Sequence, residues 1–289
     1  MKILLTGGSG FIGRNIIESL KNKYDLFYPK RNELNLLDEN EVKNFIKKNK
    51  IDIIIHSAMK PGHRNAADPN NILEENLRMF FNIARNNEFF DKMIFLSSGA
   101  VYNTNQDLKK VEESFFDKSI PKDPNGFYKY ICTKYLLEKN NIYDLRLFGV
   151  FGKYEDYSIR FISNAICKTL HNLPITIKKD RVFDYLFIDD FIDILIYWIE
   201  NKNNLQYKSY NITPTKSINL SSLALIIKEK NEIQIGDFGL GFEYSGSNFR
   251  LLNELSFNFT SYENSIENLK KWYKDNLNTI NKDFLLYDK

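Results

Sequence analysis

Two tyrosine–lysine pairs have a spacing that could support proton transfer. Tyr130 lies four residues before Lys134, and Tyr135 lies four residues before Lys139. In a helix this spacing puts both side chains of a pair on one face. An ammonium group held there stabilises a tyrosinate and lowers the tyrosine pKa from about 10 toward neutrality. Because the chain contains 17 tyrosines, such a match also arises by chance. The spacing alone leaves open which pair is functional.

A glycine-rich segment near the N-terminus has the composition of a phosphate-binding loop. The run Thr6–Gly13 contains four glycines and lies between an apolar run, Lys2–Leu5, and a segment of helical spacing, Phe11–Leu20. Glycines permit a tight turn and the close approach of a pyrophosphate, and N–H groups at the start of the next helix bind the anion. An ordinary glycine turn is the other interpretation. The order strand, loop, helix favours a dinucleotide site.

Basic residues follow the second apolar run. The sequence there is Tyr28-Pro29-Lys30-Arg31, with no acidic residue before Glu33. NAD sites place a carboxylate at this point to bind the ribose 2′-hydroxyl, and NADP sites place a cation there. Arg31, assisted by Arg14 or Lys30, would bind a 2′-phosphate. A solvated surface turn is the alternative interpretation. The sequence favours NADPH over NADH.

The first half of the chain alternates short apolar runs with amphipathic segments. The predicted strands are 2–5, 25–28, 51–56, 93–97 and 145–148, and the predicted helices are 11–20, 41–48, 72–85 and 127–139. Apolar runs that are bounded by helices are typical of a parallel sheet whose two faces are both covered. The repeated order of strand and helix predicts a doubly wound α/β fold of the Rossmann type.

After about Gly152 the alternation becomes irregular. Helices are predicted at 159–170, 188–199 and 261–275, and a strand at 175–178. This mixture indicates a smaller α+β lobe. We expect a nucleotide-binding Rossmann domain over 1–165, to which 183–205 also belongs, and a substrate-binding lobe over 166–289.

Composition excludes several classes of protein. Lysine and arginine total 40 against 37 acidic residues, a net charge of +3, which argues against a dedicated nucleic-acid binder. The cysteines Cys132 and Cys167 suit neither a disulfide framework nor a zinc site, so we expect free thiols in a reducing compartment. Three histidines speak against a multi-histidine metal site. The longest apolar stretch, around Phe191–Ile199, contains Asp193 and is too short to span a bilayer, and no signal peptide develops. We expect a cytoplasmic protein with no metal, membrane or nucleic-acid partner.

Together, the glycine loop, a serine at the end of a predicted strand and the Tyr-x-x-x-Lys pattern resemble the extended short-chain dehydrogenase/reductase family. That family comprises sugar-nucleotide epimerases, dehydratases and reductases. Its members usually have a small residue before the lysine and a glutamate four residues after it, which Thr133 and Glu138 match. The resemblance therefore implies that Tyr130 and Lys134 are catalytic, and that Tyr135 is a packing or interface residue.

The resemblance also implies roles around the cofactor and the carbonyl group. Ser98 would donate a hydrogen bond to the substrate carbonyl oxygen, and Lys134 would hold the nicotinamide ribose as well as tune Tyr130. Asn76 matches the helix asparagine of the family, with a solvated helix residue as the equal alternative. The residues placed against the cofactor are Gly7, Gly10, Phe11, Ile12, Gly13, Arg14, Arg31, Leu36, Ala58 and Lys134.

Absent residues separate the branches of the family. Its dehydratases carry an acidic pair directly after the serine, where this chain has Gly99 and Ala100. Its epimerases usually carry an acid after the second strand, which is missing here. The stretches 31–38, 58–62 and 249–252 look like the GDP-fucose synthase type, which epimerises with a cysteine at the position of Gly99 and a histidine beyond the sixth strand. No histidine lies within 154–165. The resemblance thus implies NADPH-dependent reduction of a nucleotide-linked 4-keto-6-deoxy sugar, without epimerisation. A GDP-linked hexose or heptose is the first expectation.

Four residues are placed against the substrate by the same resemblance: Lys60, His63, Arg181 and Arg250. The family usually has an arginine where this chain has Phe183. Arg181 lies two residues earlier, on the same face of a strand, and would bind a diphosphate in its place. Surface cations are the alternative for Arg181 and Arg250. Family members often dimerise through the helices at 72–85 and 127–139 as a four-helix bundle, so a homodimer is expected. The alternative functions are an NDP-sugar epimerase and a noncatalytic NADP-sensing protein.

Overall fold

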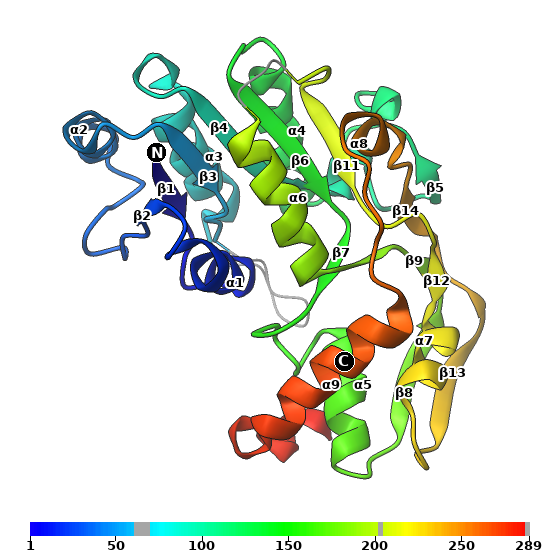
Figure 1. Ribbon diagram of the computed structural model, residues 1–289. Coiled ribbons are helices and arrows are strands. Elements are labelled where there is room, and N and C mark those ends of the chain that lie inside the picture. The colour runs from blue at the N-terminus through cyan, green and yellow to red at the C-terminus, as the bar shows by residue number, and fades with distance from the viewer. Residues whose placement is uncertain (61–69, 202–204, 287–289) are drawn as a thin grey trace.

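The computed structural model describes residues 1–60, 70–201 and 205–286. Its largest sheet contains six strands in the order β11-β6-β4-β3-β1-β2, and every neighbouring pair is parallel (Figure 1). The six strands are β1 (Lys2–Thr6), β2 (Asp25–Phe27), β3 (Ile53–His56), β4 (Lys92–Ser98), β6 (Ile142–Leu147) and β11 (Ser209–Ile212).

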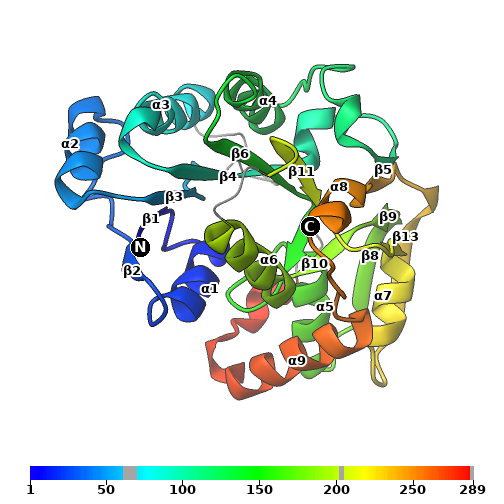
Figure 2. The same ribbon diagram turned by 45° about the horizontal axis from the view of Figure 1, so that its top comes forward.

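Helices cover both faces of this sheet (Figure 2). One face carries α1 (Phe11–Leu20) and α6 (Ile188–Glu200), and the other carries α2 (Glu39–Asn49), α3 (Ile72–Ala84) and α4 (Pro124–Leu136). The alternation along β1 shows why: Ile3 and Leu5 pack in the cluster that contains α1 and α6, whereas Leu4 packs against α2 and α3. Successive strand residues point to opposite faces, so a strand that is apolar throughout needs helices on both sides. The predicted Rossmann-type α/β fold is confirmed.

The order of the strands changes direction at β1. From β1 the chain runs to β2 at the edge of the sheet, then crosses to β3 on the other side of β1. The connection from β1 thus leads to one side of this strand, and the connection from β2 leads back past β1 to its other side. Ligands of doubly wound sheets bind at such switch points, beyond the carboxyl ends of the strands. The glycine loop directly follows β1 and therefore lies at this switch point.

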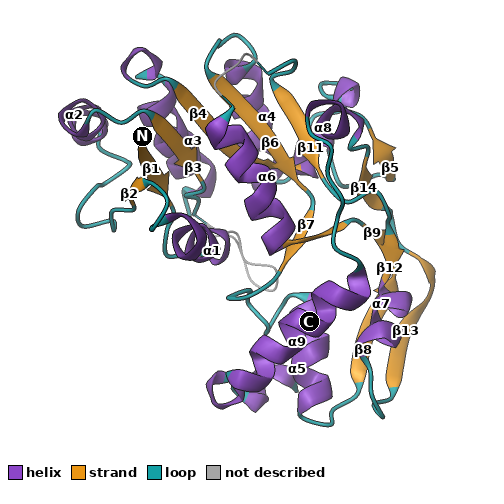
Figure 3. Cartoon of the chain, in the orientation of Figure 1, coloured by secondary structure: helices purple, strands orange, loops and turns teal. Residues whose placement is uncertain are grey.

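Segments of the second half of the chain form a smaller lobe, seen at the lower right of Figure 3. There β8 pairs with β13 in a two-stranded parallel sheet, beside three helices that contact one another. Small sheets, β12-β9-β14-β5 and β10-β7, lie between this lobe and the large sheet. The three helices are α5 (Phe161–Leu170), α7 (Leu220–Ile227) and α9 (Tyr262–Asp275), whereas α8 (Phe249–Glu254) contacts β11 of the large sheet. The strands are β5 (Leu108–Val111), β7 (Gly149–Phe151), β8 (Ile175–Asp180), β9 (Val182–Phe183), β10 (Tyr185–Phe187), β12 (Ile218–Asn219), β13 (Ile233–Leu240) and β14 (Tyr244–Gly246).

The chain returns to the large sheet at β11. This strand pairs with β6, although its residues lie outside both segments that the sequence assigned to the nucleotide-binding part, 1–165 and 183–205. The sequence did not predict β11, because its four residues, Ser-Tyr-Asn-Ile, show no apolar run even though all four are buried. The division into two domains stays a proposal, to which we add β11 on the nucleotide-binding side.

Two further features concern the environment of the chain. No helix in the described ranges is both long and apolar enough to cross a bilayer. Cys132 and Cys167 are buried free thiols, and burial raises the pKa of both. Both therefore carry their proton near neutral pH and act as packing residues.

Candidate active site

The glycine loop has the geometry that the sequence predicts for pyrophosphate binding. Gly7 has a φ of +78°, and a Cβ atom there would lie 2.7 Å from the backbone nitrogen of Ala58. A Cβ atom on Gly13 would lie 2.2 Å from the Gly7 carbonyl oxygen. Helix α1 begins after Gly10, and neither a side-chain cap nor an acidic residue in its first turn occupies its N–H groups. The loop therefore leaves a helix N-terminus open to an anion, and these residues fit a dinucleotide.

His56 ends β3 and lies opposite Thr6, the last residue of β1. Its Nδ1 lies 2.8 Å from the Thr6 hydroxyl, which in turn accepts a hydrogen bond from the Ala58 N–H at 3.3 Å. Its ring stacks on Phe95 with centroids 5.8 Å apart. Burial lowers the pKa of His56 to about 3, so the imidazole is neutral and serves as a satisfied core residue. The contact between His56 and Thr6 joins the end of β3 to the end of β1, next to the glycine loop.

The basic residues proposed for the 2′-phosphate lie on the surface. Arg31 is exposed and forms no hydrogen bond or ion pair with any residue of the described part. Arg14, also exposed, donates from Nε to the Ser9 carbonyl at 3.1 Å and lies 5.6 Å from the ring of Tyr154. The carboxylate of Glu33 accepts a bond from the backbone N–H of Lys30 at 2.7 Å. The Glu33 carboxylate thus closes a turn, and among the described residues Arg31 is available to a ligand.

The remaining predicted cofactor residues are Phe11, Ile12 and Leu36. Phe11 and Ile12 are half-buried against the core on the α1 side of the sheet. Leu36 is half-buried, and its carbonyl oxygen accepts a hydrogen bond from the Asn82 side chain at 2.9 Å. Their contact with a cofactor stays a prediction.

Helix α4 carries the tyrosine–lysine pair. It begins with Pro124, and the Asp123 carboxylate caps it by accepting the Gly126 N–H at 2.8 Å. Tyr135 packs edge-to-face on Phe81 with ring centroids 5.0 Å apart, so this residue has the packing role that was expected of it. Tyr130 and Lys134 instead share a partner, the carboxylate of Asp117.

The sequence did not predict the role of Asp117. The Tyr130 hydroxyl donates a hydrogen bond to Asp117 Oδ1, and Lys134 Nζ lies 2.8 Å from Oδ2. This hydrogen bond raises the pKa of Tyr130, and burial and the charge of Asp117 act in the same direction, against the opposing effect of Lys134. Lys134 does lower the Tyr130 pKa, as expected, but the other effects outweigh it and the pKa is raised overall. The physical reason is that a carboxylate stands between the phenol and the ammonium group.

Ser98 ends β4 and contacts a residue from the second half of the chain. Its Oγ accepts a hydrogen bond from the Ala100 N–H at 3.1 Å and lies 3.2 Å from the Tyr244 hydroxyl. In the described ranges no hydrogen bond joins Ser98 to Tyr130. A Cβ atom on Gly99 would lie 2.7 Å from both Tyr244 Oη and Phe148 Cε1. The packing thus explains why the residue after the serine has no side chain.

A buried ion pair lies beneath α4. On β6, Arg146 Nε donates to Asp144 at 2.8 Å, and both side chains are almost fully buried, at 1% and 0% exposure. The same carboxylate accepts the Thr133 hydroxyl of α4 at 3.1 Å, and Arg146 donates to the Tyr102 hydroxyl at 2.6 Å. Burial, the largest effect, raises the pKa of Tyr102 to about 12. This cluster fixes the helix that carries Tyr130 to the sheet.

The predicted substrate residues differ in their surroundings. Lys60 Nζ lies 2.6 Å from Glu75, and Asn76 exchanges two hydrogen bonds with the Lys60 backbone, at 2.7 and 3.1 Å. Asn76 is 2% exposed, so its observed role is structural and it is not a solvated helix residue. His63 lies outside the described residues.

The two arginines of the second half, Arg181 and Arg250, differ in how far other protein groups already engage them. Arg181 packs its guanidinium 4.4 Å from the centroid of the Phe183 ring, and its buried Nε has no hydrogen-bond partner among the described residues. Burial lowers the pKa of Arg181. Arg250 lies 3.6 Å from Glu113 and donates to the Ser209 carbonyl at 3.3 Å. Arg181 therefore has hydrogen-bonding capacity for an anion, whereas Arg250 is largely engaged.

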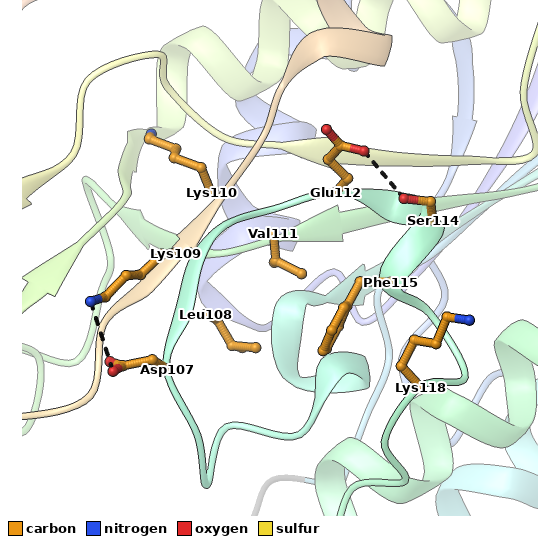
Figure 4. A pocket seen from close by; sticks show the side chains of 9 residues that line it. All are labelled: Asp107, Leu108, Lys109, Lys110, Val111, Glu112, Ser114, Phe115 and Lys118. Atoms are coloured by element: carbon orange, nitrogen blue, oxygen red, sulfur yellow. Dashed lines mark hydrogen bonds and ion pairs between the residues drawn. The ribbon is translucent and has the colours of Figure 1, made fainter.

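A shallow hollow of about 510 Å³ opens along the segment 107–118 (Figure 4). Leu108, Val111 and Phe115 form its apolar wall, and Lys109 and Lys118 stand at its sides. The residues that line it include neither the glycine loop nor the tyrosine–lysine pair. We assign no substrate to it.

Comparison with known proteins places this site in a family. A sequence profile of the NAD dependent epimerase/dehydratase family matches residues 3–213. The chain is 25% identical over 224 residues to GDP-L-colitose synthase of Yersinia pseudotuberculosis, which covers 70% of this chain and 73% of the relative.

Solved structures show the same fold. The UDP-glucose 4-epimerase of Thermotoga maritima, solved with UDP-glucose, superposes with a TM-score of 0.80 at 19% identity, over 96% of this chain and 100% of that one. The GDP-mannoheptose C4 reductase of Campylobacter jejuni, solved with NADP bound, superposes with a TM-score of 0.76 at 20% identity, over 94% and 98%.

Proposed function

The chain belongs to the NAD dependent epimerase/dehydratase family of sugar-nucleotide enzymes, and we propose that it is an NADPH-dependent C4 reductase of a nucleotide-linked 4-keto-6-deoxy sugar. The observation that carries this proposal is the packing beside Ser98. Phe148 and Tyr244 fill the space in which a side chain at position 99 would lie. No acid or base can therefore stand there to remove a proton from the sugar, and reduction does not require one.

The cofactor would be held by the glycine loop and the residues around it. The open N-terminus of α1 binds the pyrophosphate, and Arg31 with Arg14 binds the 2′-phosphate. When bound, NADPH supplies the hydride that reduces the carbonyl carbon. Lys134 is placed on the helix face that carries Tyr130, and it would exchange Asp117 for the ribose hydroxyls.

The protein residues supply the proton and polarise the carbonyl group. Tyr130 donates its phenolic proton to the oxygen as that oxygen becomes negatively charged. Asp117 helps to keep this phenol protonated before reaction, because a neighbouring carboxylate disfavours a tyrosinate. Ser98 donates a hydrogen bond to the same carbonyl oxygen. Lys134 compensates the negative charge that Tyr130 acquires after the transfer.

The substrate would be a GDP-linked sugar. The name of the Yersinia relative describes a GDP-linked sugar, and this supports the choice of nucleotide. Arg181 has an unpaired Nε and a planar guanidinium, which suit a diphosphate. Lys60 and Arg250 already pair with Glu75 and Glu113, so we assign them to the edge of the substrate site.

A turnover assay tests this function directly. Purified protein is mixed with NADPH and 4-keto-6-deoxy sugars linked to GDP, dTDP or UDP, and NADPH oxidation is followed at 340 nm together with product analysis. We expect stoichiometric oxidation and a product with a C4 hydroxyl. An epimerase would interconvert sugar nucleotides without net oxidation, and a noncatalytic NADP-sensing protein would bind NADPH without turnover. Either result would reject the reductase proposal. Tyr130→Phe should lower kcat by at least about 100-fold.

We also propose a homodimer through α3 and α4. These helices lie side by side on one face of the sheet (Figure 2), and a second copy would complete a four-helix bundle. Analytical ultracentrifugation measures the mass directly. A single species of one chain at micromolar concentration would reject the dimer.

A further inference from the structure

Tyr244 contacts Ser98 although it lies 146 residues further along the chain. We propose that Tyr244 is a positioning residue that aims the hydroxyl hydrogen of Ser98 at the substrate carbonyl oxygen. This proposal rests on the function proposed above, because it assigns a role within the same site. Ser98 and Tyr244 are both partly exposed.

The hydrogen-bond capacity of the serine oxygen supports this role. A hydroxyl group has one donor and two acceptor positions. Ser98 Oγ accepts the Ala100 N–H at 3.1 Å, which fills one acceptor position. If Tyr244 donates at 3.2 Å, the second acceptor position is filled, and the serine hydrogen remains for a carbonyl oxygen. Burial raises the pKa of Tyr244, so its phenol keeps its proton and can donate.

The structure holds the Tyr244 ring in place from several sides. Its ring centroid lies 4.8 Å from that of Phe148 and 6.1 Å from that of Phe183. Its strand, β14, pairs with both β5 and β9, and its carbonyl oxygen accepts the Asp184 N–H at 3.1 Å. A tyrosine that is fixed at both backbone and ring supplies a hydroxyl of defined position.

Glycines make room for this arrangement. A Cβ atom on Gly99 would lie 2.7 Å from the Tyr244 hydroxyl oxygen, and one on Gly246 would lie 2.5 Å from Phe148 Cζ. Any side chain at position 99 would displace the Tyr244 hydroxyl from Ser98. The absence of a side chain after the serine and the presence of the tyrosine are therefore two parts of one feature.

A kinetic double-mutant cycle separates positioning from direct contact with substrate. Tyr244→Phe keeps the ring and removes only the hydroxyl. We expect it to lower kcat about tenfold, the effect of one neutral hydrogen bond, and to change KM less than twofold. Ser98→Ala should lower kcat by about 100-fold or more. In the Ser98→Ala background, Tyr244→Phe should have no further effect, because the tyrosine acts through the serine.

A matched control removes a tyrosine hydroxyl elsewhere. The Tyr197 hydroxyl donates to the Glu254 carbonyl at 2.9 Å and accepts a bond from Asn201 at 2.9 Å, outside the site. Tyr197→Phe should leave kcat unchanged. If Tyr244→Phe left kcat of the wild type unchanged, or lowered kcat equally with and without Ser98, the positioning role would be overturned.

A stability cycle needs no substrate and therefore tests the contact even if the proposed function fails. Ser98→Ala and Tyr244→Phe should each lower the apo Tm by about 2–6 °C, and the double variant by less than the sum. Strict additivity would overturn the contact and the proposal with it. If wild type epimerises a sugar nucleotide and does not reduce one, the proposed function fails. The kinetic cycle is then run on that reaction, where the same coupling is expected.

Discussion

Three glycines of the segment that follows β1 differ in the space available for a Cβ atom. Alanine substitutions at these positions should therefore separate effects on folding from effects on cofactor binding. At Gly13 a Cβ atom would lie 2.2 Å from the Gly7 carbonyl oxygen, more than an ångström closer than an ordinary contact. At Gly7 the φ of +78° is strained for alanine, and the backbone of Ala58 is 2.7 Å away. At Gly10 the nearest atom is 3.4 Å away, an ordinary contact. Only Gly10 can take a methyl group without moving the protein backbone.

These distances give expected changes in stability. Overpacking of the kind found at Gly13 costs about 1–3 kcal/mol or more. In a chain of this size each kcal/mol lowers Tm by about 2–4 °C, so Gly13→Ala should lower the apo Tm by about 2–12 °C. Gly7→Ala should fall in the same range, because a left-handed alanine costs about 1–2 kcal/mol before any clash. Gly10→Ala should change stability by about 1 kcal/mol or less, since only the helix cap is affected.

Gly10→Ala, the variant expected to affect stability least, should nevertheless impair cofactor binding. NADP⁺ at about 100 times its Kd stabilises the folded wild type by about 2.7 kcal/mol, a rise in Tm of about 5–11 °C. Gly10→Ala should lose this rise, because its methyl group projects where the pyrophosphate approaches the start of α1. Thermal unfolding with and without NADP⁺ measures both quantities in one experiment. A full NADP⁺-induced shift in Gly10→Ala would refute the placement of the pyrophosphate on α1.

Three further predictions address the charges of the site and its support. Asp117→Asn removes the carboxylate that raises the pKa of Tyr130, so this pKa should fall in the variant. Because reduction needs the protonated phenol, the basic limb of the kcat/KM profile should move to lower pH. An unmoved limb in a pH–rate profile would contradict this. Arg31→Glu should raise the Kd for NADP⁺ by at least about tenfold and leave the Kd for NAD⁺ unchanged, measured by fluorescence titration; equal losses would argue against a 2′-phosphate contact. Asp144→Asn leaves the buried charge of Arg146 without its carboxylate partner, which costs about 3–5 kcal/mol, so Tm should fall by about 6–20 °C. A fall below about 2 °C would show that the pair is not a structural support.

Local patterns predicted the elements of the first half well. The helix 11–20 has the predicted bounds, and the predicted helix 72–85 differs from α3 by one residue. Short apolar runs predicted β1, β3 and β4, because each of these strands is buried on both faces. Such signals are local: burial against two helix layers requires apolar residues at every strand position, whatever the order of the strands.

Strands that are short or polar gave no such signal. Strand β13 spans Ile233–Leu240, yet most of its side chains are exposed, including Phe238. Strands β9 and β12 contain two residues each. Their positions depend on backbone pairing with distant segments, which leaves no period in the sequence.

The sequence by itself determined the fold class, the open helix end after Gly10 and the shared face of Tyr130 and Lys134. Each depends on residues within one or two turns of one another, where φ, ψ and helical spacing suffice. Only the tertiary structure decided what those groups contact. Asp117 reaches Tyr130 across 13 residues, and Tyr244 reaches Ser98 across 146, because the fold brings these remote polar groups together. The pKa of the phenol and the aim of the serine hydroxyl depend on these neighbours, because electrostatic and hydrogen-bond effects follow distance in space and not separation along the chain.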